Sequence, residues 1–368
     1  MAKQYRVAVI GRTGHGNYGH ALDVAWLAIP RAKVVAVADD DPAGLAEAAK
    51  RLGVTDAFAD YRQMLDKVKP DIVAIAQRWV DQHHAMILAA AQRGMHVYIE
   101  KPLCRTPAEA DEIVAACESS QAKLAVAHPT RYSPKLAAVQ EIIRAGKLGK
   151  ILELRGRGKE DKRGGGEDLW VLGSHIMDMI RAVAGNPQWC FGEVLQDGHR
   201  ITKADVADGN EGIGPLAGDT VRAMYGLADG ATAHFQSVRG AAAKNSRYGL
   251  QIFGSQGVLE LTEGIIMPVK FLPDPSWSPG RSGAAWQDVS SAGIGVPEPL
   301  KGPEYSARHT LAIENLLDSI EQNRQPTCSM YEARAAIEMI AAVFESHRLG
   351  APVQFPLKTR VNPLTLLA

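Results

Sequence analysis

Residues 5–19, YRVAVIGRTGHGNYG, contain the pattern that decides the fold, because a short apolar run meets a cluster of glycines. Arg6–Ile10 is typical of a buried strand. The literal G-x-G-x-x-G motif comprises Gly14, Gly16 and Gly19, but the glycine expected directly after the strand is Gly11. The turn must be tight at the strand end, and backbone amides must face an anion from a helix N-terminus. We therefore predict Gly11 as the turn residue, with the segment from Gly14 to Gly16 approaching the ligand closely.

Strand-like and helix-like segments alternate through residues 1–127. The expected strands are Arg6–Ile10, Val34–Ala38, Asp71–Ala76, His96–Ile99 and Lys123–Ala127, and the expected helices include Pro42–Leu52 and His83–Arg93. Thr106 is expected to cap a further helix, with Pro107 at its first position and Glu109 at its third. Continuous apolar strands that alternate with helices indicate an α/β domain with a doubly wound parallel sheet covered on both faces.

An acidic residue supports dinucleotide binding by this domain. The second strand ends at Asp39, at the spacing where a carboxylate accepts hydrogen bonds from the adenine ribose hydroxyls. Arg or Lys does not follow Asp39 directly, where a 2′-phosphate would need a cation. The pattern thus predicts a Rossmann domain over 1–127 and favours NAD over NADP. Thr13, in the second glycine position, has a hydroxyl that could bond a phosphate, and Asn17 is a further candidate cofactor residue.

Residues 128–368 have a different character and are expected to form an α+β domain. Period-2 strands at Thr220–Gly226, Ala231–Val238, Tyr248–Phe253 and Val258–Leu261 favour a large, mostly antiparallel, open sheet. One long helical stretch is expected to end near Gly185. Residues 267–305, rich in Pro, Gly, Ser and Trp, are interpreted as a loop or lid, followed by helices at Ala307–Asn323 and Tyr331–Arg348.

Composition argues against several classes of function. The 41 basic and 41 acidic residues cancel, and the chain has no basic patch of the kind that nucleic-acid binding requires. No apolar run approaches the roughly 20 residues of a membrane span. The start of the chain leaves no room for a signal peptide, so we expect a cytoplasmic protein. The four cysteines are scattered, which predicts neither a metal site nor a disulfide framework.

Further motifs identify a family resemblance that covers nearly the whole chain. Residues 96–103, HVYIEKPL, resemble the E-K-P signature of the Gfo/Idh/MocA oxidoreductases. His83 lies eleven residues before Gly94, as in that family's H-x-n-A-G-K-H-V segment. Arg131 and Pro134 are similar to its R-x-x-P stretch, and residues 173–178, GSHIMD, to its G-x-H-x-x-D helix.

The resemblance implies hydride transfer between a nicotinamide and a hydroxyl carbon of a sugar, inositol or related polyol. In the family, the lysine that matches Lys101 interacts with the reacting hydroxyl, and the histidine that matches His175 helps to move its proton. The chemistry suits these residue types, because removal of hydride from a carbinol also requires loss of the hydroxyl proton. A free lysine has a pKa near ~10.4, which burial beside a cationic ring would lower. Histidine titrates closest to neutrality.

Other candidate residues surround these two. We expect Gln77, Trp79, His83 and Glu100 to contribute to the cofactor site together with Lys101, and Arg131, Tyr132 and Trp170 to contribute to substrate binding together with His175. The family often has Asp or Asn four residues before the histidine, where this chain has Val171. Asp168 would share a helical face with His175 if the helix continued between them, and we predict it as the catalytic replacement. Glu167 and the Lys159-Glu160-Asp161 stretch are the alternatives.

Two other functions remain open at this point. Family relatives include NAD-dependent glycosidases that act by transient oxidation and elimination, and a regulator that binds NAD without catalysis. Net production of NADH would distinguish a dehydrogenase from the glycosidase. Since exposed antiparallel sheets often form subunit contacts, we also expect a homodimer or homotetramer.

Overall fold

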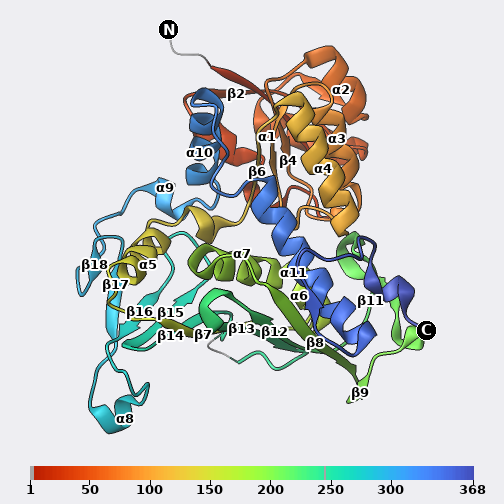
Figure 1. Cartoon of the computed structure of the whole chain (residues 1–368). Helices are drawn as coiled ribbons and strands as arrows, with labels where there is room; N and C mark the ends of the chain where they lie inside the picture. Colours follow the sequence, from red (N-terminus) through yellow and green to blue (C-terminus); the bar gives the residue numbers. More distant parts are fainter. Residues whose placement is uncertain (1–3, 244–245) are drawn as a thin grey trace. The chain divides into compact units, whose positions relative to one another are not determined.

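The computed structural model describes residues 4–243 and 246–368, and the chain divides into two compact units (Figure 1). The first unit combines Met1–Ala127 with Asn210–Ile213 and Ala307–Arg334. The second comprises His128–Gly209, Gly214–Ser306 and Ala335–Ala368. Among the described residues, no helix is both long enough and apolar enough for a membrane crossing.

A six-stranded parallel sheet forms the centre of the first unit and confirms the predicted doubly wound fold. Its order is β3-β2-β1-β4-β5-β6. The strands are β1 Tyr5–Ile10, β2 Ala32–Ala38, β3 Asp56–Phe58, β4 Ile72–Ile75, β5 His96–Ile99 and β6 Leu124–Val126. The helices are α1 Pro42–Leu52, α2 Tyr61–Val68, α3 His83–Ala91, α4 Pro107–Ser120, α10 Thr310–Glu321 and the start of α11 Met330–Leu349, with short 3₁₀ turns at Val80–Gln82 and Asn210–Gly212. The strand order reverses between β1 and β4, where such sheets bind ligands.

Local capping explains why several helices begin where the sequence predicts. The Asp41 side chain accepts a hydrogen bond from the Gly44 amide at 2.6 Å, and Pro42 occupies the first turn of α1. Thr106 accepts from the Glu109 amide at 3.1 Å, as predicted for α4. Each contact satisfies a helix N–H that lacks an intrahelical partner.

The first crossover differs from the expected strand–loop–helix unit. After the glycine loop the chain forms only the 3₁₀ turns η1 Gly19–Ala21 and η2 Val24–Ala28. Asn17, His20 and Ala21 have positive φ angles of 54°, 50° and 63°, which interrupt any right-handed helix that begins at the loop. The prediction of a helix N-terminus facing the anion is therefore wrong for this segment.

The second unit contains a large mixed sheet, mostly antiparallel as predicted. Its path is β18-β17-β16-β15-β14-β7-β13-β12-β8-β19, with β9 paired to β8, and only β7 and β13 are parallel neighbours among the described strands. The strands are β7 Ile151–Arg157, β8 Trp189–Gln196, β9 His199–Arg200, β12 Thr220–Gly226, β13 Thr232–Val238, β14 Gly249–Gly254, β15 Gly257–Thr262, β16 Val269–Leu272, β17 Gln287–Ser290, β18 Gly293–Ile294 and β19 Val353–Gln354. A separate pair joins β10 Ala207–Gly209 to β11 Gly214–Leu216.

Helices cover one face of this sheet. α7 Gly173–Ala184 packs on β7, β13 and β14, with Ile176 directly over Gly156 (Figure 1). The α11 backbone at Val343 packs on Gly192 in β8. The remaining helical segments of the unit are α5 Pro134–Arg144, α6 Gly166–Val171, α8 Pro279–Ser282, α9 Pro303–Ser306 and the 3₁₀ turns Pro129–Tyr132, Lys203–Asp205, Ala228–Gly230 and Pro363–Leu366.

Two expectations for this unit need correction. The single helical stretch before Gly185 is two helices, because Leu172 has a φ of −115° and separates α6 from α7. The segment 267–305 is not only a loop, since β16, β17 and β18 extend the sheet through it. Trp277 shows why its composition is misleading, because it packs on Phe253 and donates from Nε1 to the Gly254 carbonyl oxygen at 2.8 Å.

Candidate functional site

The glycine loop follows β1 directly, and two of its glycines are required by close packing. A Cβ on Gly11 would lie 2.1 Å from the Tyr18 ring. Gly16 has a φ of +87°, and a Cβ there would lie 2.7 Å from the Trp79 amide nitrogen. The loop thus lies against both its own return segment and the end of β4. The close contacts at Gly11 and Gly16 are with protein atoms, so the predicted approach of this segment to a ligand stays a prediction.

Side chains of the loop bond mainly within the loop and to the end of β2. The Thr13 amide and hydroxyl donate to Asp39, and the Gly14 amide donates to Asn17 Oδ1 at 2.9 Å. Asp39 is 2% exposed and also accepts from the Tyr18 hydroxyl at 2.9 Å. The predicted residues Thr13, Asn17 and Asp39 are therefore brought together, but by contacts with protein donors.

The Glu100-Lys101-Pro102 turn follows β5 at the same edge of the sheet. Glu100 is buried and lies 2.8 Å from His20 Nδ1, and it also accepts from the Lys101 amide at 3.1 Å. Burial opposes the charge, but the His20 contact and the positive charge of Lys101 lower the pKa of Glu100 to about 2. The Lys101–Pro102 peptide is cis, and the Lys101 side chain is buried.

His83 supports this turn from the first residue of α3. Its Nδ1 lies 2.8 Å from the Pro102 carbonyl oxygen and its Nε2 lies 2.9 Å from the Gln77 carbonyl oxygen. Burial lowers the pKa of His83, so a neutral ring can donate to only one carbonyl at a time. The ring is fully buried, which indicates that His83 holds two segments in place. Gln77 donates to the Trp79 carbonyl oxygen at 2.6 Å, and the Trp79 ring meets His15 edge-on.

The second unit contains a compact polar cluster around α7. His175 is 3% exposed; its ring centroid lies 5.1 Å from that of His128, and its Nδ1 lies 3.8 Å from Glu263 Oε1. Tyr248 faces the same ring at 6.5 Å between centroids and donates to the Leu172 carbonyl oxygen. Sequence reasoning missed Tyr248 and Glu263 as neighbours of His175. The available signal was their place beside two predicted strands, because Tyr248 directly precedes β14 and Glu263 directly follows β15.

Asp178 lies one helical turn after His175 and is paired with Arg131. The Arg131 guanidinium donates to both carboxylate oxygens, at 2.7–3.1 Å, and to the Asp178 carbonyl oxygen at 2.9 Å. Burial opposes the charge of Asp178, but Arg131 and His128 lower its pKa. Arg131 is thus committed to positioning α7. The predicted neighbour Tyr132 is partly exposed at the end of the same 3₁₀ turn.

Two predicted residues on α6 are buried in the protein interior. Trp170 is 2% exposed, which leaves little surface for stacking on a sugar. Asp168 accepts from the Glu160 amide at 3.0 Å and the Ser237 hydroxyl at 2.5 Å. Because the helix is interrupted at Leu172, the seven-residue spacing does not place Asp168 and His175 on one continuous helical face. The contacts of Asp168 are those of a group that fastens the 158–166 loop to β13.

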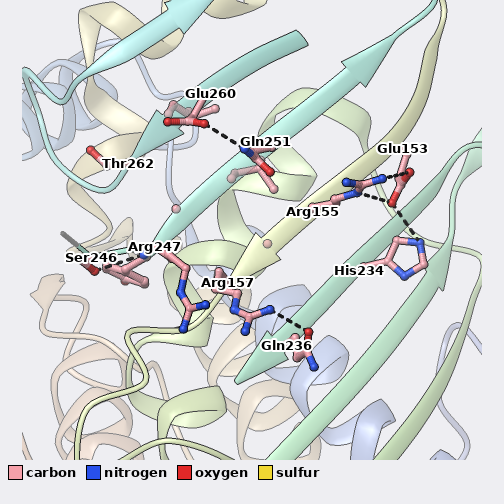
Figure 2. A pocket seen from close by; sticks show the side chains of 15 residues that line it. Glu153, Arg155, Arg157, His234, Gln236, Ser246, Arg247, Gln251, Glu260 and Thr262 are labelled. Atoms are coloured by element: carbon pink, nitrogen blue, oxygen red, sulfur yellow. Dashed lines mark hydrogen bonds and ion pairs between the residues drawn. The ribbon is translucent and has the colours of Figure 1, made fainter. Parts of the chain in front are cut away.

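The opposite face of the large sheet contains a hollow of about 560 Å³ (Figure 2). Charged side chains alternate along its strands and neutralise one another, as in the Arg155–Glu153 pair at 2.7 Å. Arg157 donates to Gln236, and Arg247 pairs with Glu160 at 2.9 Å. Residue alternation places Arg155 on the face away from α7, since Gly156 faces Ile176. This hollow is therefore mainly a feature of the open sheet face, and Tyr248 lines it as well as facing His175.

Comparison with known proteins identifies two matching family models. Residues 5–128 match the oxidoreductase family with an NAD-binding Rossmann fold, and residues 136–260 match the GFO/IDH/MocA C-terminal domain. Together the two matches cover more than half of the chain.

Individual relatives are more distant. The chain is 29% identical to levoglucosan dehydrogenase of Pseudarthrobacter phenanthrenivorans over 283 residues, which cover 67% of this chain and 72% of that protein. It is 22% identical to scyllo-inositol 2-dehydrogenase (NAD(+)) of Bacillus subtilis, across 97% and 98% of the two chains. A solved levoglucosan dehydrogenase in complex with NADH and L-sorbose has a similar fold, with a TM-score of 0.77 at 22% identity over 96% of this chain and all of that one.

Proposed function

This chain belongs to the Gfo/Idh/MocA family of NAD-binding oxidoreductases, and on that premise we propose an NAD-dependent dehydrogenase acting on a CH–OH group. Its substrate class is a sugar, inositol or related polyol. The observation that carries the proposal is the Glu100-Lys101-Pro102 turn after β5, which contacts from His20 and from the buried His83 hold in place. The named activities of the relatives, on levoglucosan and scyllo-inositol, support the same substrate class.

The first unit fits a dinucleotide by its packing. Gly11 and Gly16 allow the loop to pack closely against Tyr18 and Trp79. The loop lies at the carboxyl ends of β1 and β4, where open α/β sheets bind ligands. We assign the loop residues Gly11, Thr13, Gly14, Gly16 and Asn17, with Gln77 and Trp79, to holding NAD. When bound, NAD⁺ would accept the hydride from the substrate carbon.

Lys101 would bind the reacting hydroxyl group of the substrate, and His175 would accept its proton. The Lys101 ammonium group, beside the buried carboxylate of Glu100, would bind the hydroxyl oxygen of the substrate. His175 Nδ1 lies 3.8 Å from Glu263 Oε1, and this carboxylate would stabilise the ring after it takes up a proton. A positioned general base of this kind contributes about 10²–10⁴-fold to a rate.

The test is a screen of sugars, inositols and anhydro-sugars for net reduction of NAD⁺ by the purified protein. On the best substrate, Lys101→Met and His175→Asn should each lower kcat/KM by about a hundredfold or more while NADH still binds. Lys50→Met and His199→Asn change exposed residues of the same types and should leave the rate unchanged. Release of an aglycone without net NADH would instead identify a glycosidase, and full activity of the Lys101 variant would remove the proposed mechanism.

We also propose that the protein is a homo-oligomer formed through the open face of the large sheet. The strand register of the sheet aligns four residues across β8, β12, β13 and β7, namely Phe191, Met224, His234 and Arg155. The Phe191 side chain is 38% exposed. Apolar side chains next to internally paired charges suit contact with an identical surface.

A further inference from the structure

A chain of hydrogen bonds in the first unit connects distant segments to the residue that follows the glycine loop. The Tyr98 hydroxyl group lies 2.8 Å from His309 Nδ1, and His309 Nε2 lies 3.0 Å from the His20 carbonyl oxygen. Since a carbonyl oxygen only accepts, His309 donates from Nε2 and accepts a hydrogen bond from Tyr98 at Nδ1. Burial lowers the pKa of His309, which agrees with a neutral ring. His309 thus fixes the backbone of His20.

The His20 backbone has a conformation that residues with a Cβ rarely adopt. Its φ angle is +50°, and that of Ala21 is +63°, so two consecutive residues lie in the left-handed region. Such strain persists only where the surrounding structure imposes it, and it is concentrated at functional sites. The position into which this backbone brings the His20 side chain therefore indicates what the strained segment does.

The His20 side chain meets the carboxylate of Glu100. His20 Nδ1 lies 2.8 Å from Glu100 Oε1, while Glu100 Oε2 accepts from the Lys101 amide at 3.1 Å. Glu100 is 1% exposed, and a Cβ on Gly19 would lie 3.1 Å from its Cγ, so the loop packs directly on this side chain. His20 and the Lys101 amide therefore occupy one carboxylate oxygen each.

Other titratable groups near Glu100 are buried in their neutral forms. Burial raises the pKa of Tyr98 and lowers the pKa values of His83 and His309, so none of the three carries charge near pH 7. Arg308 adds a positive charge beside Tyr98 and His309. A buried carboxylate such as Glu100 needs a cation in direct contact, because burial alone disfavours its charged form.

His20 and Lys101 supply that compensation together. Burial raises the pKa of Glu100, but the hydrogen bond and charge of His20 and the charge of Lys101 more than offset this effect. The His20 side chain is 35% exposed, so its ring exchanges protons with solvent. Lys101 is buried, and its ammonium group is the one that the proposed reaction needs for the substrate.

We propose that His20 is a positioning residue that compensates the charge of Glu100 and thereby leaves the Lys101 ammonium group able to bind the substrate hydroxyl. Without His20, Lys101 would be the cation left beside the buried carboxylate, and the resulting ion pair would hold the ammonium group and favour its charged form. The assignment rests on the proposed dehydrogenase activity.

The reactivity of the Lys101 amine tests this assignment without substrate turnover. The purified full-length chain is acetylated with trace acetic anhydride over a range of pH, and peptide mass spectrometry measures the acetylation of Lys101 against a reference amine. Only the neutral amine reacts. His20→Gly should therefore raise the pH at which Lys101 is half reactive by about one pH unit or more, the effect of an uncompensated opposite charge.

Two further variants separate the hydrogen bond from the backbone. Glycine and asparagine both tolerate a positive φ, so neither His20→Gly nor His20→Asn adds strain. Asparagine has a nitrogen bonded to Cγ, as histidine has Nδ1, and His20→Asn keeps a donor but cannot be charged. It should give a smaller shift in the same direction. Ala21→Gly, at the neighbouring left-handed residue with an exposed side chain, is the matched control and should not move the midpoint.

Kinetics on the best substrate give the second readout. His20→Gly should lower kcat/KM by about tenfold, the effect of losing one hydrogen bond to a charged group, while NADH binds as in the wild type. His20→Asn should recover part of this loss, and Ala21→Gly should have the wild-type rate.

An unchanged Lys101 midpoint in His20→Gly, or an equal shift in Ala21→Gly, would overturn the proposal. If His20→Gly does not fold, an unchanged midpoint in His20→Asn would overturn it instead. A Lys101 amine that stays unlabelled in the folded wild type would also do so, because the proposal requires an amine that a small molecule reaches. The expected shifts without oxidation of any polyol would leave the compensation of Glu100 by His20 intact and refute the proposed activity.

Discussion

Buried carboxylates in this protein have their pKa values shifted in opposite directions by their partners. Asp178 is buried against a guanidinium group, and its pKa is lowered. Asp168 is buried among neutral donors, so desolvation outweighs its hydrogen bonds to Ser237 and Glu160 and raises its pKa. The charge of Asp178 is thus compensated by a neighbouring cation, whereas burial destabilises the charged form of Asp168.

Asp168→Asn tests whether this residue fastens a loop or takes part in catalysis. The amide oxygen can still accept from Glu160 and Ser237, so we expect kcat/KM to remain near the wild-type value. Asp168→Ala leaves both donors unpaired and should cost about 1–3 kcal/mol of unfolding free energy.

The pH dependence of the same variant has a definite sign. Burial raises the folded pKa of Asp168 above the unfolded value of 3.8. The contribution of Asp168 to the free energy of unfolding of the wild type is therefore highest at low pH and falls as pH rises from 3.8 through the folded pKa. Urea unfolding of wild type and Asp168→Asn between pH 4 and 8 should show the variant gaining relative stability with pH. A large fall in kcat/KM at unchanged stability would instead support the catalytic role predicted from the sequence.

At the scale of single elements, the glycine loop offers a matched pair of positions. Gly14 and Gly16 have φ angles of +81° and +87°, but a Cβ on Gly14 meets nothing within 4 Å. Gly14→Ala should therefore cost only the left-handed strain of about 1–2 kcal/mol. Gly16→Ala adds a clash with the Trp79 amide nitrogen and Arg78, and should be less stable and bind NADH more weakly. Thermal melting and NADH titration of the two variants measure the difference, and equal effects would show that the close approach at Gly16 has no role.

Elements with strong local signals could be predicted from the sequence, and those set by neighbouring chain segments could not. Pro42–Leu52 and His96–Ile99 have the predicted bounds, because a cap with proline defines the first and a continuous apolar run the second. β3 has three residues and an exposed pattern, and only its pairing with β2 defines it as a strand. The strands within 267–305 likewise depend on pairing, β16 with β15, β17 with β16 and β18 with β17, which a composition rich in Pro and Gly conceals.

At the scale of the whole molecule, the candidate residues divide in the same way. Motifs identified Lys101 and His175, because each occurs in a short recognisable segment. The neighbours of His175 come from three separate parts of the second unit, at His128, Tyr248 and Glu263, and no sequence period connects them. Asp39 is the opposite case. Its spacing from the glycine loop predicts a contact with the cofactor, but its carboxylate accepts hydrogen bonds from Thr13 and Tyr18 of the protein. Motif spacing thus identifies candidate residues, and packing decides which of their atoms remain available to a ligand.

The open face of the large sheet gives the last prediction, which concerns assembly. Phe191 lies on that face because its neighbour Gly192 packs against Val343 of α11. The strand register continues from Phe191 through Met224 and His234, so a flat row of side chains is available to a second copy. Light scattering should therefore give a multiple of the monomer mass, and Phe191→Glu should reduce it, since a charge buried at such a contact is costly. Leu27→Glu, at a leucine that is 53% exposed in the first unit, is the control and should not change the mass. A monomeric wild type would refute the proposed oligomer, and an unchanged mass for Phe191→Glu would exclude this face as the contact.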